Sequence, residues 1–181
     1  VVLYRPPLDK RWKVTGGNWV SSAREYVYHD NLWSPFAPRL DVVEVPGSTG
    51  CVHMTLVPQG GGRIAAFFRR RQADFVYRTE SGDGGRSWSV PEATDVPNNN
   101  SSIVAIALGD GRVALLCNPV NAEQSGARRA SLYDELGEGD DGRGDPVGGV
   151  RALWGVPRAP LTLCLSDDGG RTFPRRRLVE D

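Results

Sequence analysis

The sequence has few cysteines, histidines and methionines, and no excess of charge that would attract a nucleic acid. Its 181 residues include only three cysteines, two histidines and one methionine. With so few ligands, no cluster with the spacing of a metal site can be drawn, and no cofactor is expected. The 22 basic and 22 acidic residues balance to a formal net charge of zero, so no nucleic-acid partner is expected.

Long apolar runs are also missing. No stretch of about 18 apolar residues occurs, so we expect no transmembrane helix and no membrane partner. No charged-then-apolar leader is visible at Val1, although a truncated N-terminus could have lost one. The compartment therefore stays open between extracellular and cytoplasmic. No phosphate-binding glycine loop is present either, because residues 109–112 read as a hairpin turn.

The three cysteines are Cys51, Cys117 and Cys164, and each lies in or beside an apolar strand. An odd number cannot pair completely, and small apolar strand positions suit a buried thiol. We expect buried free thiols, with a disulfide or a metal site as the alternative.

An octapeptide occurs twice, at residues 81–88 and 166–173, and reads Ser-x-Asp-x-Gly-x-(Ser/Thr)-aromatic. The aspartate can accept hydrogen bonds from turn amides, the glycine tolerates a positive φ, and the aromatic side chain anchors the turn. The positions that carry the motif are Ser81, Asp83, Gly85 and Trp88, then Ser166, Asp168, Gly170 and Phe173.

The repeat extends beyond the octapeptide. Residues 52–69 and 103–119 each read as an apolar strand, a Gly-Arg turn and a second apolar strand. With a third strand, the Asp turn and a fourth strand, each copy predicts a four-stranded antiparallel meander, the size of one propeller blade. The second copy carries an extra stretch at 121–151, read as a long loop between strands two and three. No helix is predicted.

The double motif resembles the Asp box, or BNR repeat, of sialidase (neuraminidase)-like β-propellers. The resemblance covers residues 46–181, and several stretches outside the Asp boxes also match the bacterial-type branch: residues 46–54, 67–69, 97–102 and 154–160. It implies an all-β, six-bladed propeller with its pocket on the axis and the Asp boxes on the opposite rim. The Asp boxes therefore predict the fold and say nothing direct about chemistry.

The chain is short for such a ring, which needs roughly 250 residues or more. We expect a partial or degenerate preceding blade at 1–45, a blade at 46–97, and a second blade at 98–181 with its insertion at 121–151. The remaining blades would come from missing sequence or from another chain.

The resemblance implies a glycoside hydrolase that acts on sialic acid or a related acidic sugar, whose carboxylate is bound by three arginines. Arginine suits this role because its planar fork is always charged and binds a carboxylate bidentately. Arg69 and Arg158 stand where the family places two of them. The alternative for Arg69 is that it caps a strand edge, as one of three adjacent arginines. The third arginine is counted as missing, and Arg5 as a chance match.

Catalysis in this family uses a tyrosine nucleophile paired with a glutamate, and an aspartate as acid/base. The glutamate should precede Cys51, but residues 47–50 read Gly-Ser-Thr-Gly, and Glu44 is the nearest carboxylate. The catalytic residues are therefore unknown, and the segment alone is expected to be inactive. The alternatives are a non-catalytic carbohydrate-binding or scaffold propeller, and an enzyme for a different glycan.

Four asparagines are candidate substrate-binding residues. Asn98, Asn99 and Asn100 lie at the crossover between the predicted blades, and Asn118 ends an inner strand. Their amides could bind sugar hydroxyls, or they could simply form turns.

Two further residues are candidates for the pocket. His53 lies on an inner strand and could face the axis, or it could be a structural histidine. Asp74 could face the substrate, or it could be an ion-pair partner of Arg69 or Arg71.

Overall fold

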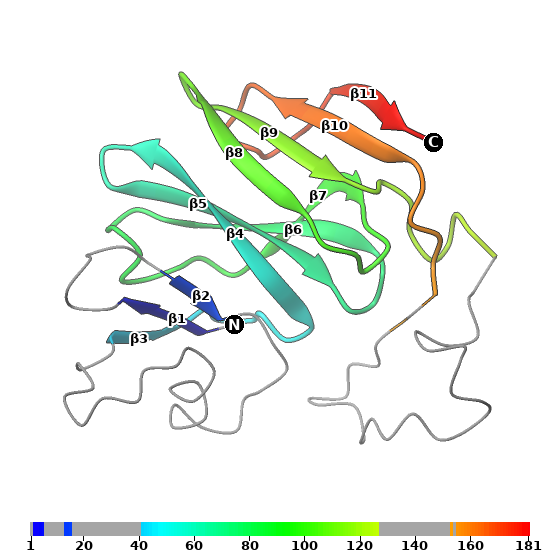
Figure 1. Ribbon diagram of the computed structural model, residues 1–181. Coiled ribbons are helices and arrows are strands. Elements are labelled where there is room, and N and C mark those ends of the chain that lie inside the picture. The colour runs from blue at the N-terminus through cyan, green and yellow to red at the C-terminus, as the bar shows by residue number, and fades with distance from the viewer. Residues whose placement is uncertain (1, 6–12, 16–40, 127–152, 154) are drawn as a thin grey trace, which may run out of the picture.

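The computed structural model describes residues 2–5, 13–15, 41–126, 153 and 155–181. These residues form strands and loops without a helix (Figure 1). Consequently, none of them belongs to a helix long and apolar enough to cross a membrane. The all-β fold class is confirmed.

Two sheets contain four antiparallel strands each. Both are meanders in which strands that follow one another in the chain are hydrogen-bonded neighbours. The first sheet contains β4 (Cys51–Gly60), β5 (Arg63–Arg70), β6 (Phe75–Ser81) and β7 (Glu92–Pro97). The second contains β8 (Val104–Gly109), β9 (Arg112–Cys117), β10 (Leu161–Ser166) and β11 (Arg175–Glu180). This is the arrangement that the repeat predicts for propeller blades.

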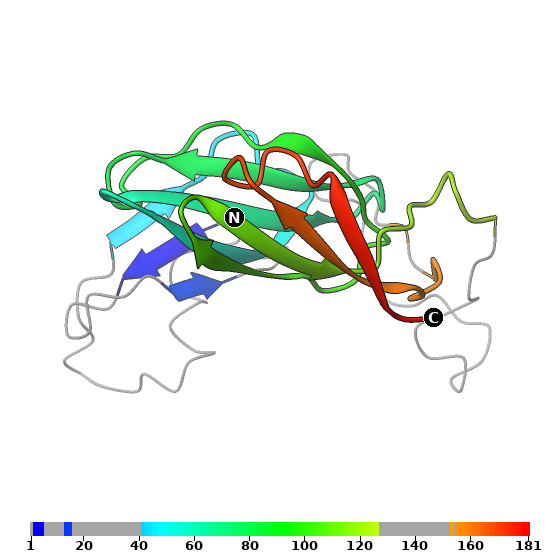
Figure 2. The same cartoon turned by 90° about the horizontal axis from the view of Figure 1, so that it is seen from above.

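A third, smaller sheet is built from the N-terminal strands. It contains β1 (Val2–Arg5), β2 (Lys13–Thr15) and β3 (Asp41–Glu44), in the order β2-β1-β3. In Figure 1 it lies on the side of β4 away from β8, and both β2 and β8 contact β4. The first four-stranded sheet therefore lies between the other two in Figure 1. Seen from above, the N-terminal strands and β11 lie toward opposite ends of the molecule (Figure 2). The division into units at residues 45 and 97 stays a prediction.

The two four-stranded sheets bury one shared core. Alternate residues of β5 and β9 point into it, because successive side chains of a strand face opposite sides. Its centre contains Phe67 of the first sheet and Phe173 of the second, both fully buried, with ring centroids 6.0 Å apart in a T-shaped contact. Cys117 and Cys164 belong to the same core, and together with Cys51 they are free and buried, as predicted.

Polar contacts surround this core and join the two sheets. Arg78 donates to the carbonyl of Gly169 at 3.0 Å, and Arg171 bonds Glu80 at 3.0 Å. Asp95, next to the core residue Val96 in β7, accepts the backbone N–H of Phe173 at 2.9 Å and also pairs with Arg176. The contact between the sheets is thus apolar at its centre and hydrogen-bonded at its margin.

Both Asp boxes have the hydrogen bonds that the motif predicts. In the first, Asp83 Oδ1 accepts the N–H groups of Arg86 at 2.9 Å and Ser87 at 3.0 Å, and it also accepts the hydroxyl of Ser81 at 2.8 Å. Asp168 makes the same set of bonds in the second. Burial alone would raise the pKa of Asp168, but the bonds from Thr172 and Ser166 outweigh burial and lower it to about 2.

The glycine of the second Asp box is required by space as well as by backbone conformation. Gly170 has φ +82°, and a Cβ there would lie 2.2 Å from Phe67 Cζ. Neighbouring Gly169 has a similar φ of +74°, but the atom nearest to its Cβ would be 3.4 Å away. Of these two neighbouring glycines, only Gly170 combines the left-handed conformation with close packing.

Gly170→Ala should consequently destabilise the protein far more than Gly169→Ala. Both variants lose the left-handed freedom of glycine, worth about 1–2 kcal/mol, and overpacking against Phe67 adds about 1–3 kcal/mol. Denaturant unfolding of the two variants measures the difference. Equal losses in stability would show that the contact between Gly170 and Phe67 is unimportant.

Candidate functional site

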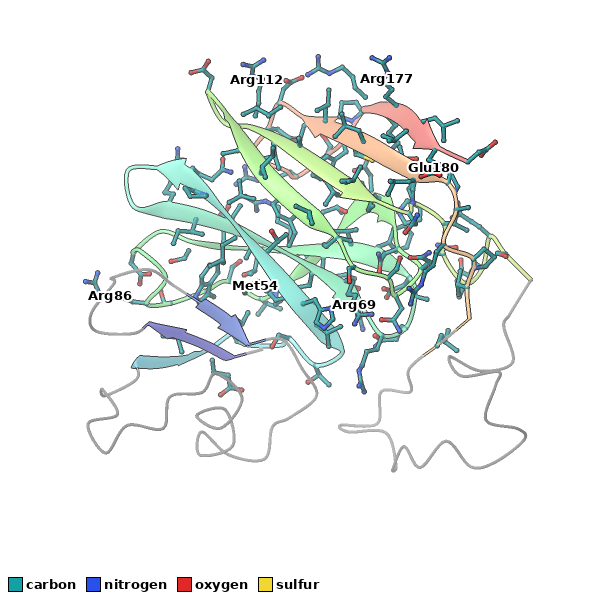
Figure 3. The ribbon with its side chains drawn as sticks, viewed as in Figure 1. Met54, Arg69, Arg86, Arg112, Arg177 and Glu180 are labelled. Atoms are coloured by element: carbon teal, nitrogen blue, oxygen red, sulfur yellow. The ribbon has the colours of Figure 1, made fainter. Side chains whose placement is uncertain are left out.

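The candidate site lies at the end of the first sheet opposite its Asp box. Arg69 is near the end of β5, and Figure 3 shows it far from Arg86 of the first Asp box. The register agrees, since Ser81 pairs with Ile64 at one end of β5 while Phe68 pairs with Tyr77 toward the other. The Asp box is therefore too far away to take part in this site.

The guanidinium of Arg69 is held by two neutral side chains. Its Nε donates to His53 Nδ1 at 3.1 Å, and its Nη1 donates to Asn100 Oδ1 at 3.0 Å and to the Asn100 carbonyl. Burial, Arg158 and Arg71 lower the pKa of Arg69 to about 10. The group nevertheless keeps its positive charge at neutral pH.

Both residues that hold Arg69 have an unusual backbone. His53 has φ 53° and Asn100 has φ 62°, in the left-handed region that residues other than glycine rarely adopt. At His53 the pairing of β4 with β5 shifts register between Val52 and Thr55. Such strain persists only where surrounding contacts enforce it, and it is concentrated at functional sites.

The four candidate asparagines are buried, and they hold neighbouring backbone. The Asn99 amide donates to the Pro157 carbonyl at 2.6 Å, and the Asn118 amide donates to the carbonyls of Arg158 at 2.8 Å and Pro160 at 3.0 Å. Asn98 Oδ1 accepts the Asn100 N–H at 3.0 Å.

These bonds place the segment that carries Arg158 beside the crossover. The alternative, a structural role of the four asparagines in forming turns, is therefore supported by direct hydrogen bonds. Their role in binding sugar hydroxyls stays a prediction.

Arg158 is exposed and lies just before β10, which begins at Leu161, so it does not open the strand as the sequence suggested. Its charge acts on Arg69, because it is one of the causes that lower the pKa of Arg69. The structure thus brings Arg69, near the end of β5, close to the segment of Arg158, because Asn100 binds Arg69 while the adjacent Asn99 binds the Pro157 carbonyl.

Asp74 pairs with Arg70, Nη1 to Oδ2 at 3.3 Å, whereas the sequence suggested Arg69 or Arg71 as its partner. Its other oxygen accepts the backbone N–H of Phe75 at 2.7 Å. The Arg70 guanidinium also stacks on the Tyr77 ring, 4.3 Å from the centroid. Because both oxygens of Asp74 have partners, a role in binding substrate stays a prediction without direct support.

The described residues give no catalytic set. Glu44 is exposed at the end of β3, and the turn at residues 45–50 separates it from Cys51. Within the described ranges no three His, Cys, Asp or Glu side chains group as metal ligands.

The comparison with protein families agrees with the repeated Asp boxes. Residues 14–181 match the family model described as a BNR repeat-like domain. The chain belongs to this family. No curated protein matches the sequence.

Membership in the BNR repeat-like family confirms the resemblance on which the fold prediction rested. BNR repeats typically form propellers, and the two meanders of this BNR-repeat chain fit partial blades. The match names no catalytic residue. The chemistry must therefore be argued from Arg69, Arg158 and their neighbours.

The contact between His53 and Arg69 predicts a dependence of stability on pH. Burial and the charge of Arg69 lower the pKa of His53 below its ordinary 6.5. The folded protein then binds fewer protons than the unfolded chain, so stability should fall as the pH decreases through 6.5.

Unfolding of the wild type and of His53→Asn by denaturant, at pH values from 7.5 to about 5, measures this effect. The variant, which has no imidazole, should lose less stability over that range. Parallel curves would contradict the prediction.

Proposed function

We propose that this chain is part of a sialidase-like glycoside hydrolase that acts on sialic acid or a related acidic sugar. Arg69 and Arg158 bind the carboxylate of the sugar. The observation that carries this proposal is that neighbouring asparagines hold both arginines near each other: Asn100 binds Arg69 of the first sheet, and Asn99 and Asn118 bind the backbone around Arg158.

The surroundings of Arg69 support an anionic ligand. Its described contacts, to His53 and Asn100, are to neutral groups, so they position the guanidinium without neutralising it. Neighbouring arginines raise the free-energy cost of the positive charge on Arg69, and a bound carboxylate would lower that cost. Charge-assisted hydrogen bonds to a carboxylate are among the strongest that arginine makes.

A second candidate is a carbohydrate-binding propeller without catalysis. Residues 47–50, Gly-Ser-Thr-Gly, stand where the family resemblance places a glutamate, and this observation favours the second candidate. Hydrolysis of a fluorogenic sialoside by the complete protein distinguishes the two. Turnover supports the hydrolase, and binding without turnover supports the lectin-like alternative.

Arg158→Ala should weaken binding of N-acetylneuraminic acid to the complete protein by about tenfold or more, because one charge-assisted bond is lost. The methyl ester of the sugar, which has no carboxylate, should bind the variant and the wild type alike. Arg112→Ala is the control, since Figure 3 shows Arg112, the first residue of β9, far from Arg69. Unchanged affinity in Arg158→Ala would refute the proposed role of the two arginines.

We also propose that further blades complete the ring, from this protein or from another chain. The outer face of the second sheet is apolar yet exposed, with Val104 at 57%, Ile106 at 55% and Leu116 at 36%. In the repeat, Leu116 stands where Phe67 stands in the first sheet, and Phe67 is fully covered by the second sheet. An equivalent blade would cover Leu116 in the same way.

Ile106→Lys should therefore destabilise the complete protein by about 2 kcal/mol or more, because a charge would be buried under the next blade. Val90→Lys is the control, since Val90 is equally exposed at 57% but lies outside this face. Denaturant unfolding measures both variants. Similar small effects would show that the face of the second sheet stays open.

A further inference from the structure

The guanidinium of Arg69 faces both ring nitrogens of His53, and the N–H groups of the two side chains cannot all be satisfied by each other. Arg69 Nε lies 3.1 Å from His53 Nδ1, and Arg69 Nη2 lies 3.4 Å from His53 Nε2. Arginine has donors only, so the bond from Nε requires His53 Nδ1 to be the acceptor. In a neutral imidazole the other nitrogen, Nε2, then carries the proton.

This tautomer places two donors side by side. His53 Nε2–H and Arg69 Nη2–H cannot bond each other, although their nitrogens are 3.4 Å apart. Arg69 Nη1 is already used by the carbonyl and the side-chain oxygen of Asn100. An oxygen that accepts from both Nε2 and Nη2 is the partner that fits this pair.

We propose that His53 Nε2 and Arg69 Nη2 form a donor pair that binds one anionic oxygen of the ligand. This inference rests on the proposed function, in which that oxygen belongs to the carboxylate of an acidic sugar. The role of His53 is then to contact the ligand, in addition to positioning Arg69. The second carboxylate oxygen is left for Arg158.

Three features of the structure support an anion at this place. His53 is exposed, so a ligand can reach its Nε2. Arg158 and Arg71 add positive charge around Arg69. The left-handed backbones of His53 and Asn100 fix both partners of Arg69, and preorganised donors of this kind bind an anion without reorganisation.

Two variants at His53 separate a ligand contact from a structural role. His53→Asn tolerates the left-handed φ and keeps an oxygen that can accept from Arg69 Nε, but its short amide cannot reach the place of Nε2. His53→Gly tolerates the φ and has no side chain. If His53 only positioned Arg69, the asparagine variant would bind the ligand like the wild type.

Binding of N-acetylneuraminic acid and of its methyl ester to the complete protein, measured by titration calorimetry, provides the test. We expect both variants to bind the acid about tenfold or more weakly than the wild type, with little change for the ester. Wild-type affinity in His53→Asn would overturn the donor pair. Failure of the wild type to bind the acid would overturn both the donor pair and the proposed function.

The tautomer is tested without a ligand by nitrogen-15 NMR of the imidazole. We expect a proton on Nε2 and none on Nδ1 of His53 at neutral pH. A proton on Nδ1 would overturn the inference by itself. Conversely, unchanged acid binding in Arg158→Ala, with weakened binding in His53→Asn, would count against the two-arginine site and leave the donor pair standing.

Discussion

The packing of Phe67 against the second Asp box is the contact on which the rest of the structure depends. It sets how the second sheet lies on the first, and it is possible only because Gly170 has no side chain. The candidate site is assembled from both sheets, with Arg69 from β5 and Arg158 from the segment before β10. The contact at the centre of the core therefore positions the two sheets that supply the residues of the site.

Buried amides carry this geometry from the sheets to the two arginines. Asn99 and Asn118 bind the backbone around Arg158, and Asn100 binds Arg69 directly. Ser101 links this group, since its hydroxyl donates to Asn118 Oδ1 at 2.9 Å. Buried polar groups that are satisfied in this way rigidify a structure, because breaking one bond leaves its partner unpaired in a dry environment. The crossover is thus a rigid support for the site.

The sequence was sufficient to predict the meanders, the Asp-box hydrogen bonds and the buried thiols, because strand alternation and turn chemistry are local. The family resemblance also suggested Arg69 and Arg158 as ligand-binding residues, and that role stays a prediction. It could not show that Asp74 pairs with Arg70, since the orientation of neighbouring arginines depends on the strand register. The sequence also could not predict the contact of His53 with Arg69, because this contact depends on the irregular backbone and the register shift at His53.

The contact between the two four-stranded sheets joins unlike surfaces, because the face that carries Phe67 in the first sheet packs on the face that carries Leu115 in the second, whereas Leu116, the repeat counterpart of Phe67, lies on the other face. Such an interface is heterologous. Each added unit covers the exposed face of the previous unit and exposes an equivalent face of its own. The number of units is then decided by the rotation between neighbours: a rotation that divides a full turn gives a closed ring, and any other gives an open helical filament. The packing of Phe173 against Phe67, at the centre of this contact, therefore contributes to the rotation between the two neighbouring sheets.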